Sequence, residues 1–344
     1  MRLFVKKTLL ITTALLASLV SANTSFASST ACKAPNSATP SLGTLVVAGQ
    51  LAQLPSVQWG VDQGCYAQFG LQVKAVAVST SQIALAGVVG GSYDLAITTP
   101  VNLIQAKVNG NIDGIFVAPR HGYTALQLAR AQTPPLYPGY LILQTGLIVK
   151  TNSSIKSWSD LSGKKIAIQS FQSADQAGTI LALRSRGVDT SKVQFLTMPS
   201  SQMGAALDAG SVDAVVANEP FATQIIQNGG TLIGYPNSFF QKAGVAVVYA
   251  SVRSVVQNKS SAMRAFQKAT LFINHLLNQT SNQDSYRKTI SSVTGVSAEV
   301  ANATQLPTMI ERNVSTSDLY YIVDNLKKVG FMPVGPNLQA MLFK

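Results

Sequence analysis

Two stretches decide the fold: Gly-Ser-Tyr-Asp-Leu-Ala-Ile-Thr at 91–98 and Gly-Ser-Val-Asp-Ala-Val-Val-Ala at 210–217. Each begins with small residues and passes through an aspartate into a mostly apolar run, which is typical of a turn followed by a buried strand. Upstream, Ser-Gln recurs at 81–82 and 201–202. An internal match of this kind, about 120 residues apart, indicates two related halves.

Both halves alternate apolar strand patterns with helical ones. Expected strands are 45–48, 71–78, 95–98, 166–169, 193–197, 214–217 and 245–250. Expected helices are 55–66, one capped by 79–81 that ends at 89, 174–186, one capped by 200–202, and 260–277, 282–292 and 317–329. Alternation of this type predicts mostly parallel sheets that are covered by helices on both faces.

The fold class predicted is therefore α/β with two lobes and a ligand cleft between them, because such sheets bind ligands beyond the carboxyl ends of their strands. Residues 28–42 are expected to be a flexible leader. The first lobe is expected to comprise 43–140 and 243–344, and the second 141–242.

Residues 1–27 have the pattern of a secretory signal peptide, with a basic start, an apolar run at 9–20 and small residues before a cleavage point after Ala27. Cleavage after Ala22 is the alternative. A lipoprotein anchored through Cys32 is disfavoured, because 29–31 lack the aliphatic residue usually found there. We expect an exported protein.

The composition excludes several classes of function. Hydrophobic residues make up 47% of the chain, which argues against disorder. The formal net charge is +12, but the basic residues are scattered and form no nucleic-acid-binding stripe. Two histidines and two cysteines make a metal site improbable. In an exported protein, Cys32 and Cys65 form either a disulfide or two separate thiols.

Four stretches together resemble the periplasmic substrate-binding proteins of ABC importers, in the nitrate, sulfonate and taurine branch that is related to thiamine-pyrimidine precursor binders. The stretches are Trp59–Val73, Leu85–Thr99, Trp158–Ala167 and Leu207–Phe221. The resemblance implies a monomeric protein that closes its lobes on a small organic anion or zwitterion. It also implies delivery to a membrane permease with a cytoplasmic ATPase.

Residues at the starts of helices are the first candidates for ligand contacts, because the free N–H groups of helix N-termini favour anions. These candidates are Gln53, Leu54, Ser79, Thr80, Ser81, Ser170, Gln172 and Ser173. Ordinary helix capping is the alternative for each, and for Ser200 and Ser201 it is preferred.

Strand ends supply the second group of candidates. Thr98 and Thr99 occupy the same relative place as Ala217 and Asn218 in the other half, and Glu219 follows Asn218. Glu219 would favour a zwitterionic or neutral ligand, or would stabilise a hinge. Arg120 and His121 follow an expected strand at 114–118, and an arginine on a loop there can pair with a sulfonate or carboxylate. A solvated loop is the alternative.

No motif of a catalytic nucleophile, phosphate loop or metalloprotease appears, so we expect a binder without a cofactor rather than an enzyme. Three alternatives remain: a binder of a thiamine-pyrimidine-type heterocycle, an exported sensor subunit, and a thiamine-pyrimidine-synthase-like enzyme.

Overall fold

A computed structural model describes residues 31–32, 39–133 and 141–344. The expected signal peptide and part of the expected leader lie outside these residues, as do residues 134–140. The chain from Ala31 to Lys344 forms one compact unit. In the described part of the chain, no helix has both the length and the apolar character needed to cross a bilayer.

The first sheet has six strands in the order β11-β4-β10-β3-β1-β2. Its strands are β1 (Thr44–Gln50), β2 (Gln72–Val78), β3 (Leu95–Thr98), β4 (Gly114–Tyr123), β10 (Gly244–Val252) and β11 (Thr308–Met309). β1 pairs in parallel with β2 and β3, whereas β10 runs antiparallel to both β3 and β4.

The second sheet has five strands in the order β7-β6-β8-β5-β9. Its strands are β5 (Thr145–Lys150), β6 (Lys165–Ile168), β7 (Gln194–Thr197), β8 (Ala214–Asn218) and β9 (Gly230–Gly234). β6 pairs in parallel with β7 and β8, and β5 runs antiparallel to β8 and β9.

Both sheets are thus mixed rather than mostly parallel, and the antiparallel directions of β5 and β10 have a common cause. β5 and β10 are the strands that bring the chain into one sheet from the other. The parallel strands of each sheet end at the edge where the chain crosses over, so an incoming strand starts at that edge and must run in the opposite direction.

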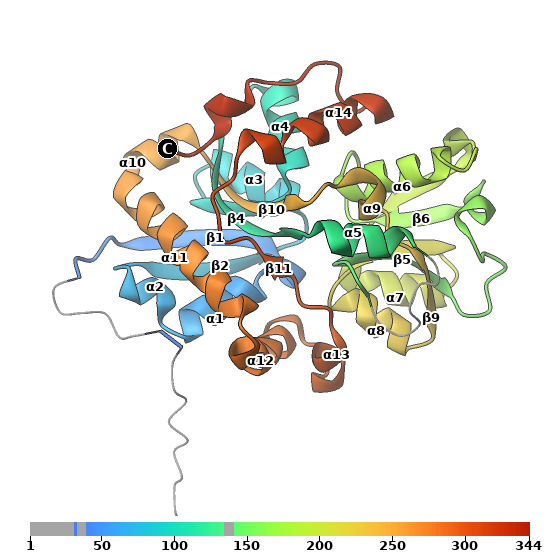
Figure 1. Ribbon diagram of the computed structural model, residues 1–344, viewed down its shortest axis with the longest axis horizontal. Coiled ribbons are helices and arrows are strands. Elements are labelled where there is room, and N and C mark those ends of the chain that lie inside the picture. Colours follow the sequence, from blue (N-terminus) through green and yellow to red (C-terminus); the bar gives the residue numbers. More distant parts are fainter. Residues whose placement is uncertain (1–30, 33–38, 134–140) are drawn as a thin grey trace, which may run out of the picture. The chain divides into compact units, whose positions relative to one another are not determined.

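Helices cover both faces of the first sheet (Figure 1). One face packs on α1 (Pro55–Asp62), α2 (Cys65–Gln68), α11 (Ser260–Asn278) and α12 (Gln283–Thr294). The other packs on α3 (Ser81–Val89), α4 (Pro100–Gly110) and α14 (Tyr320–Val329). The sequence analysis missed α4, which a Thr99 cap and Pro100 in its first turn start directly after β3.

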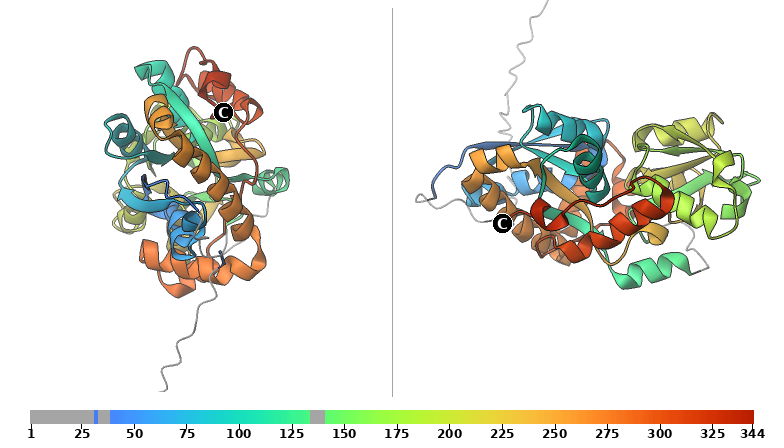
Figure 2. Two further views of the ribbon diagram at one scale, coloured as in Figure 1. Left: turned by 90° about the vertical axis from the view of Figure 1, so that its left-hand side faces the viewer. Right: turned by 90° about the horizontal axis from the view of Figure 1, so that it is seen from above.

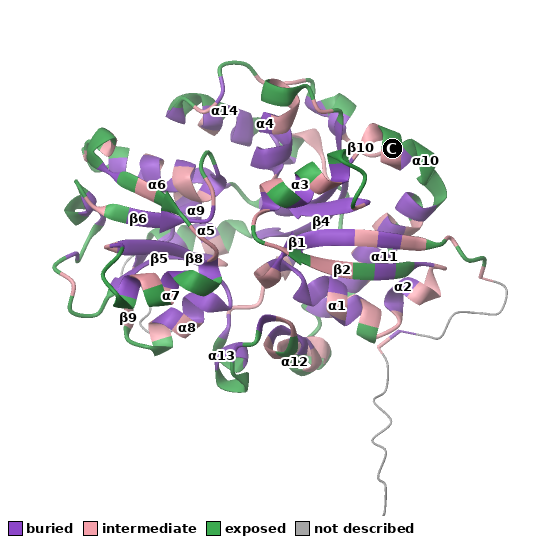
Figure 3. Cartoon of the chain, turned by 180° about the vertical axis from the view of Figure 1, so that it is seen from behind, coloured by how far each residue is buried: buried purple, intermediate pink, exposed green. Residues whose placement is uncertain are grey.

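The second sheet is covered in the same way. One face packs on α7 (Ser200–Asp208) and α8 (Phe221–Gln227), and the other on α6 (Ala174–Arg184). The remaining helices are α5 (Ala125–Gln132), α9 (Asn237–Phe240), α10 (Arg253–Asn258) and α13 (Ala298–Ala303). The strands between these layers are largely buried, and the exposed residues lie mainly on outer helix faces and loops (Figure 3).

Helix α14 packs against helices of both lobes (Figure 2). Its apolar face shares a core with α4 and with Ala177 and Ile180 of α6. Tyr321 donates to the Gln241 side chain at 2.6 Å, and Asn325 donates to the Phe240 carbonyl at 2.7 Å. The C-terminal helix therefore fixes both lobes on one side of the molecule.

The repeated aspartates hold the central strands in register. The Asp94 carboxylate accepts from the Val46 amide at 2.9 Å, and the Asp213 carboxylate accepts from the Lys165 amide at 2.8 Å. Earlier in each repeat, Gly91 and Gly210 have positive φ angles of 77° and 70°, a backbone conformation that residues with a side chain rarely adopt. The repeat is therefore structural: it anchors β1 to β3 and β6 to β8.

We expect Asp94→Ala and Asp213→Ala each to destabilise the protein by about 1–2 kcal/mol, because each removes a charge-assisted bond to a backbone amide. Thermal melting should fall by a few degrees. Ligand affinity should stay unchanged, because neither residue lines the cavity described below. Asp324→Ala, at an exposed position on α14, is the matched control. An equal loss in that control would contradict the assignment.

Candidate functional site

A small cavity lies between the two sheets, lined from both lobes. Its volume is about 70 Å³, which is room for on the order of five water molecules. Most lining side chains are polar. They are Gln50, Gln53, Ser81, Thr99, Asn102, Arg120, His121, Tyr123, Gln144, Thr145, Gln169, Ser170, Ser173, Asp175, Asn218, Glu219, Asn237 and Gln241, together with Ala52, Ala174, Ala246 and Val247.

Arg120 is the only lysine or arginine among these lining residues. Its side chain is 3% exposed, and it lies on β4, which continues to Tyr123. The prediction of a loop after residue 118 is therefore wrong, and so is the alternative that Arg120 lies on a solvated loop. The strand extends because β10 pairs with it as far as Gly122 and Tyr123.

The Arg120 guanidinium has neutral partners in the protein. Its Nε donates to the Ser56 hydroxyl at 2.9 Å, and its Nη1 contacts Nδ1 of His121. Among the described residues, no carboxylate lies within ion-pair distance of it. A buried cation without an anionic partner is costly, so this arrangement favours an anion in the cavity.

His121 is neutral at ordinary pH. Burial, and then the positive charge of Arg120, hold its pKa well below the usual value. Its Nδ1 can then accept from Arg120, which fixes the orientation of the guanidinium. His121 is therefore best described as a positioning residue for Arg120.

The first lobe contributes an amide-rich wall at the ends of β1 and β3. The Gln50 side chain donates to the Ser79 carbonyl at 3.3 Å and accepts from Ser81 at 3.5 Å. Asn102 donates to the Thr98 hydroxyl at 3.1 Å. These bonds fix the wall, so that Gln53, Ser81 and Asn102 line the cavity in defined positions.

The second lobe contributes the start of α6. Ser173 is its N-cap and accepts from the Gln176 amide at 3.2 Å, so its hydroxyl oxygen also has a capping role. Asp175 follows in the first turn and lines the cavity beside Asn237. Burial raises the pKa of Asp175 to about 6, and a hydrogen bond from Asn237 opposes that rise.

Glu219 joins the two lobes. Its Oε1 accepts from the Thr223 hydroxyl at 2.8 Å and from the Gln305 amide, on the other lobe, at 2.8 Å. Its Oε2 accepts from the Thr223 amide at 3.0 Å. Because three donors already occupy this carboxyl group, the structure favours the hinge alternative over a ligand contact.

We expect the free energy of unfolding to fall as the pH rises, because of Glu219. Burial raises its pKa to about 7, against 4.5 for an ordinary glutamate. The folded state therefore holds a proton that the unfolded state releases. This contribution, at most ~3 kcal/mol, is complete below about pH 4.5 and is lost as the pH rises through about 7.

Melting curves from pH 4.5 to 8 should show this slope in the wild type and a smaller one in Glu219→Gln. Asp175, whose pKa is also raised, contributes in the same direction, so some slope should remain. An unchanged slope in Glu219→Gln would contradict the prediction.

Nine of the residues that the sequence singled out come together in the cavity. They are Gln53, Ser81, Thr99, Arg120, His121, Ser170, Ser173, Asn218 and Glu219. Five do not line it: Leu54, Ser79, Thr80, Thr98 and Gln172.

The five outside the cavity have other positions. Leu54 packs in the apolar core, because it ends a 3₁₀ turn that faces inward. Ser79 is exposed, and Thr80 caps α3 by accepting from Ile83. Thr98 is fully buried and holds Asn102. Gln172 is exposed on a turn with a positive φ of 56°.

Several cavity residues were not predicted from the sequence, among them Gln50, Asn102, Asp175 and Asn237. Asp175 could have been found, because it lies in the first turn of the helix that Ser173 caps. Asn237 has no such local signal. It belongs to a one-turn helix whose position depends on contacts with α6 and α5.

The comparisons with known proteins agree with this fold. A sequence profile described as the NMT1-like family matches residues 49–291. No curated protein sequence matches the chain.

Several solved structures share the fold. The alkanesulfonate-binding protein SsuA from Xanthomonas axonopodis pv. citri, bound to MOPS, has a TM-score of 0.70 and 17% identity over 87% of this chain and 98% of that one. The periplasmic aliphatic sulphonate binding protein SsuA from Escherichia coli has a TM-score of 0.65 and 18% identity over 87% and 97%. The desulfurization enzyme DszB has a TM-score of 0.60 and 11% identity over 87% and 96%.

At these identities the likeness establishes the fold alone. The chain has the α/β periplasmic binding protein fold, as the resemblance implied and as the two-lobed strand and helix pattern predicted in coarser form.

Proposed function

The chain belongs to the NMT1-like family, and from this premise we propose that it is an exported solute-binding protein that captures a small organic anion by closing its lobes. The observation that carries the proposal is Arg120, a buried cation that lines the cavity and has no carboxylate partner among the described residues. An anionic ligand supplies the missing charge, and a planar guanidinium can hold a sulfonate or carboxylate through two bonds.

The solved relatives support the same class of ligand and partner. Two of them are named as sulfonate-binding proteins, and another is named as the ligand-binding component of an ABC-type import system. We propose that this chain likewise delivers its ligand to a membrane permease that is driven by an ATPase. Lobe closure would present the loaded form to that permease, because contacts from both lobes favour the closed state.

We propose binding without chemical conversion. Both cysteines of the chain are joined in a disulfide, so neither is a free nucleophile. The same pairing occupies the Cys32 thiol and so opposes the lipoprotein alternative. The neutral His121 already forms a hydrogen bond with Arg120. The Glu219 carboxyl group already accepts hydrogen bonds from three donors. We therefore expect neither residue to act as a general base.

The test is thermal melting of residues 28–344 against taurine, alkyl and aryl sulfonates, nitrate, carboxylates and hydroxymethylpyrimidine. A ligand at 100 times its Kd stabilises by about 2.7 kcal/mol, which is a shift of several degrees. We expect shifts with small sulfonates or carboxylates and unchanged ligand after prolonged incubation. A shift with the pyrimidine alone would move the assignment to a vitamin-precursor binder, and turnover of the ligand would replace it with an enzyme.

A further inference from the structure

The second lobe presents a buried acceptor that the protein does not satisfy. Asn237 is 6% exposed and lines the cavity. Its Nδ2 donates to the Tyr123 hydroxyl at 3.3 Å, whereas its Oδ1 has no hydrogen-bond partner among the described residues. Since a buried carbonyl oxygen without a donor is unfavourable, this atom points to a donor group supplied by the ligand.

Asp175 lies beside this acceptor and carries the negative charge of the second-lobe wall. Its carboxyl group lines the same cavity. No lysine or arginine of the described residues lies within ion-pair distance of it. Its position in the first turn of α6 is electrostatically favourable for the helix, so the fold tolerates the charge there.

Glu219 does not belong to this acceptor group. Its two oxygens are occupied by Thr223 and by the Gln305 amide, as described above. The acceptors available to a ligand on the second lobe are therefore the Asp175 carboxylate and the Asn237 carbonyl.

The two unpaired charges of the cavity come from opposite lobes. Arg120 belongs to β4 of the first lobe, and Asp175 to α6 of the second. Among the described residues, they form no ion pair with each other. The cavity between them, about 70 Å³, suits a molecule of few atoms.

Resting on the proposed function, we propose that the ligand is a small zwitterion. Its anionic group binds Arg120 on the first lobe, and its ammonium group binds Asp175 and the Oδ1 atom of Asn237 on the second. Each lobe alone satisfies only one end of such a ligand, so both charges are neutralised only when the lobes are closed. An anion without a donor would leave the Oδ1 atom of Asn237 without a hydrogen bond and Asp175 without a cation.

Three sulfonates of similar size test this inference: taurine, 2-hydroxyethanesulfonate and 1-propanesulfonate, which end in an ammonium, a hydroxyl and a methyl group. Titration calorimetry with residues 28–344 at pH 7.5 gives the Kd of each, and β-alanine replaces taurine if carboxylates are preferred. We expect the ammonium compound to bind at least about 10-fold tighter than the methyl compound, because a site built for a donor rejects an analogue that lacks it.

The variant Asp175→Asn keeps the size of the side chain and removes its charge. It should weaken binding of the ammonium compound about 10-fold or more and leave the methyl compound within about 3-fold of the wild type. Retained binding of the methyl compound also shows that the variant is folded. Asp208→Asn, at the exposed end of α7 on the same lobe, is the matched control and should change neither Kd.

The outcomes separate the inference from the proposed function. If the methyl and ammonium compounds bind equally to the wild type, or if Asp175→Asn weakens both equally, the zwitterion inference is overturned while anion capture stands. If no sulfonate or carboxylate binds, the proposed function fails and the inference fails with it.

Discussion

Replacing Arg120 with glutamine should reduce affinity for the anionic ligand by about 30- to 5,000-fold, because truncating one member of a buried charge pair costs about 2–5 kcal/mol. Glutamine keeps a polar side chain against Ser56 but cannot neutralise the ligand. Arg120→Lys should also bind poorly, since an ammonium lacks the planar fork that Ser56 and His121 orient.

The stability of the unliganded protein should change in a different way. Arg120 is buried without a carboxylate partner among the described residues, so its removal relieves an unfavourable charge while losing the hydrogen bonds to its two neutral partners, Ser56 and His121. We expect the unliganded Arg120→Gln protein to melt within a few degrees of the wild type. Calorimetric titration and melting curves on the same sample separate affinity from stability.

Arg130→Gln provides the matched control, because Arg130 is exposed in the last turn of α5 and does not line the cavity. It should bind ligand as the wild type does. Normal affinity in Arg120→Gln would show that the ligand is not held by this guanidinium and would remove the main support for anion capture.

Removing the disulfide should have the largest effect on stability. Cys32 and Cys65 are buried and are separated by 33 residues in the chain. A cross-link that closes a loop of this length is expected to contribute about 4 kcal/mol by restricting the unfolded chain. The double variant Cys32→Ala, Cys65→Ala should therefore melt on the order of 10 °C lower.

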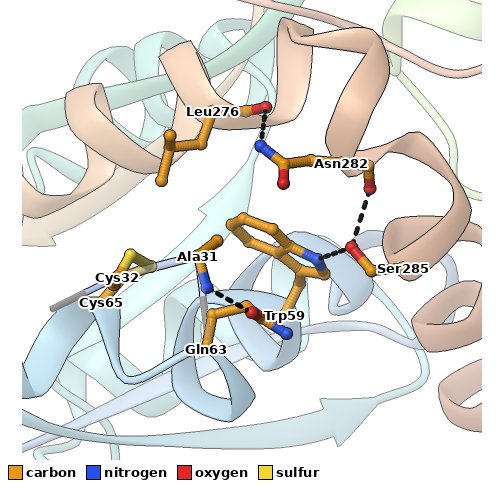
Figure 4. Close-up of a disulfide and its surroundings, with 8 residues drawn as sticks. All are labelled: Ala31, Cys32, Trp59, Gln63, Cys65, Leu276, Asn282 and Ser285. Atoms are coloured by element: carbon orange, nitrogen blue, oxygen red, sulfur yellow. Dashed lines mark hydrogen bonds between the residues drawn. A yellow bond between two sulfur atoms is a disulfide. The ribbon is translucent and has the colours of Figure 1, made fainter. Parts of the chain in front are cut away.

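The surroundings of the bridge explain why its loss should stay local (Figure 4). The Ala31 amide donates to the Gln63 side chain at 2.8 Å beside it. The nearby Trp59 indole donates to Ser285 at 2.9 Å and joins α1 to α12 independently of the sulfur atoms. Neither cysteine lines the ligand cavity, so ligand affinity should be unchanged.

Melting with and without a reductant provides the control for this prediction. Reduction should lower the melting temperature of the wild type and leave the double variant unchanged. A double variant as stable as the wild type would show that the bridge does not constrain the unfolded chain. A large loss of ligand affinity at a temperature where the variant is folded would show that the bridge also shapes the cavity.

The repeated Gly-Ser-x-Asp pattern and the strand-helix alternation were sufficient to predict two α/β lobes, because strand and helix periodicity and turn chemistry are local properties. Capping residues were predictable for the same reason: Thr80 and Ser173 both accept a backbone hydrogen bond at the start of a helix. The two cysteines could be recognised as a possible pair, but only their proximity in the fold joins them.

The site itself depends on contacts between residues that are far apart in the chain. Arg120 is buried because β10 pairs with β4 and because Ser56, 64 residues earlier, accepts from its guanidinium. Asp175 and Asn237 meet where α6 packs on α9. Local sequence therefore determined the lobes and their helix caps. The tertiary structure alone decided which polar side chains face one another across the cleft, because burial and unpaired charge arise only from packing between distant segments.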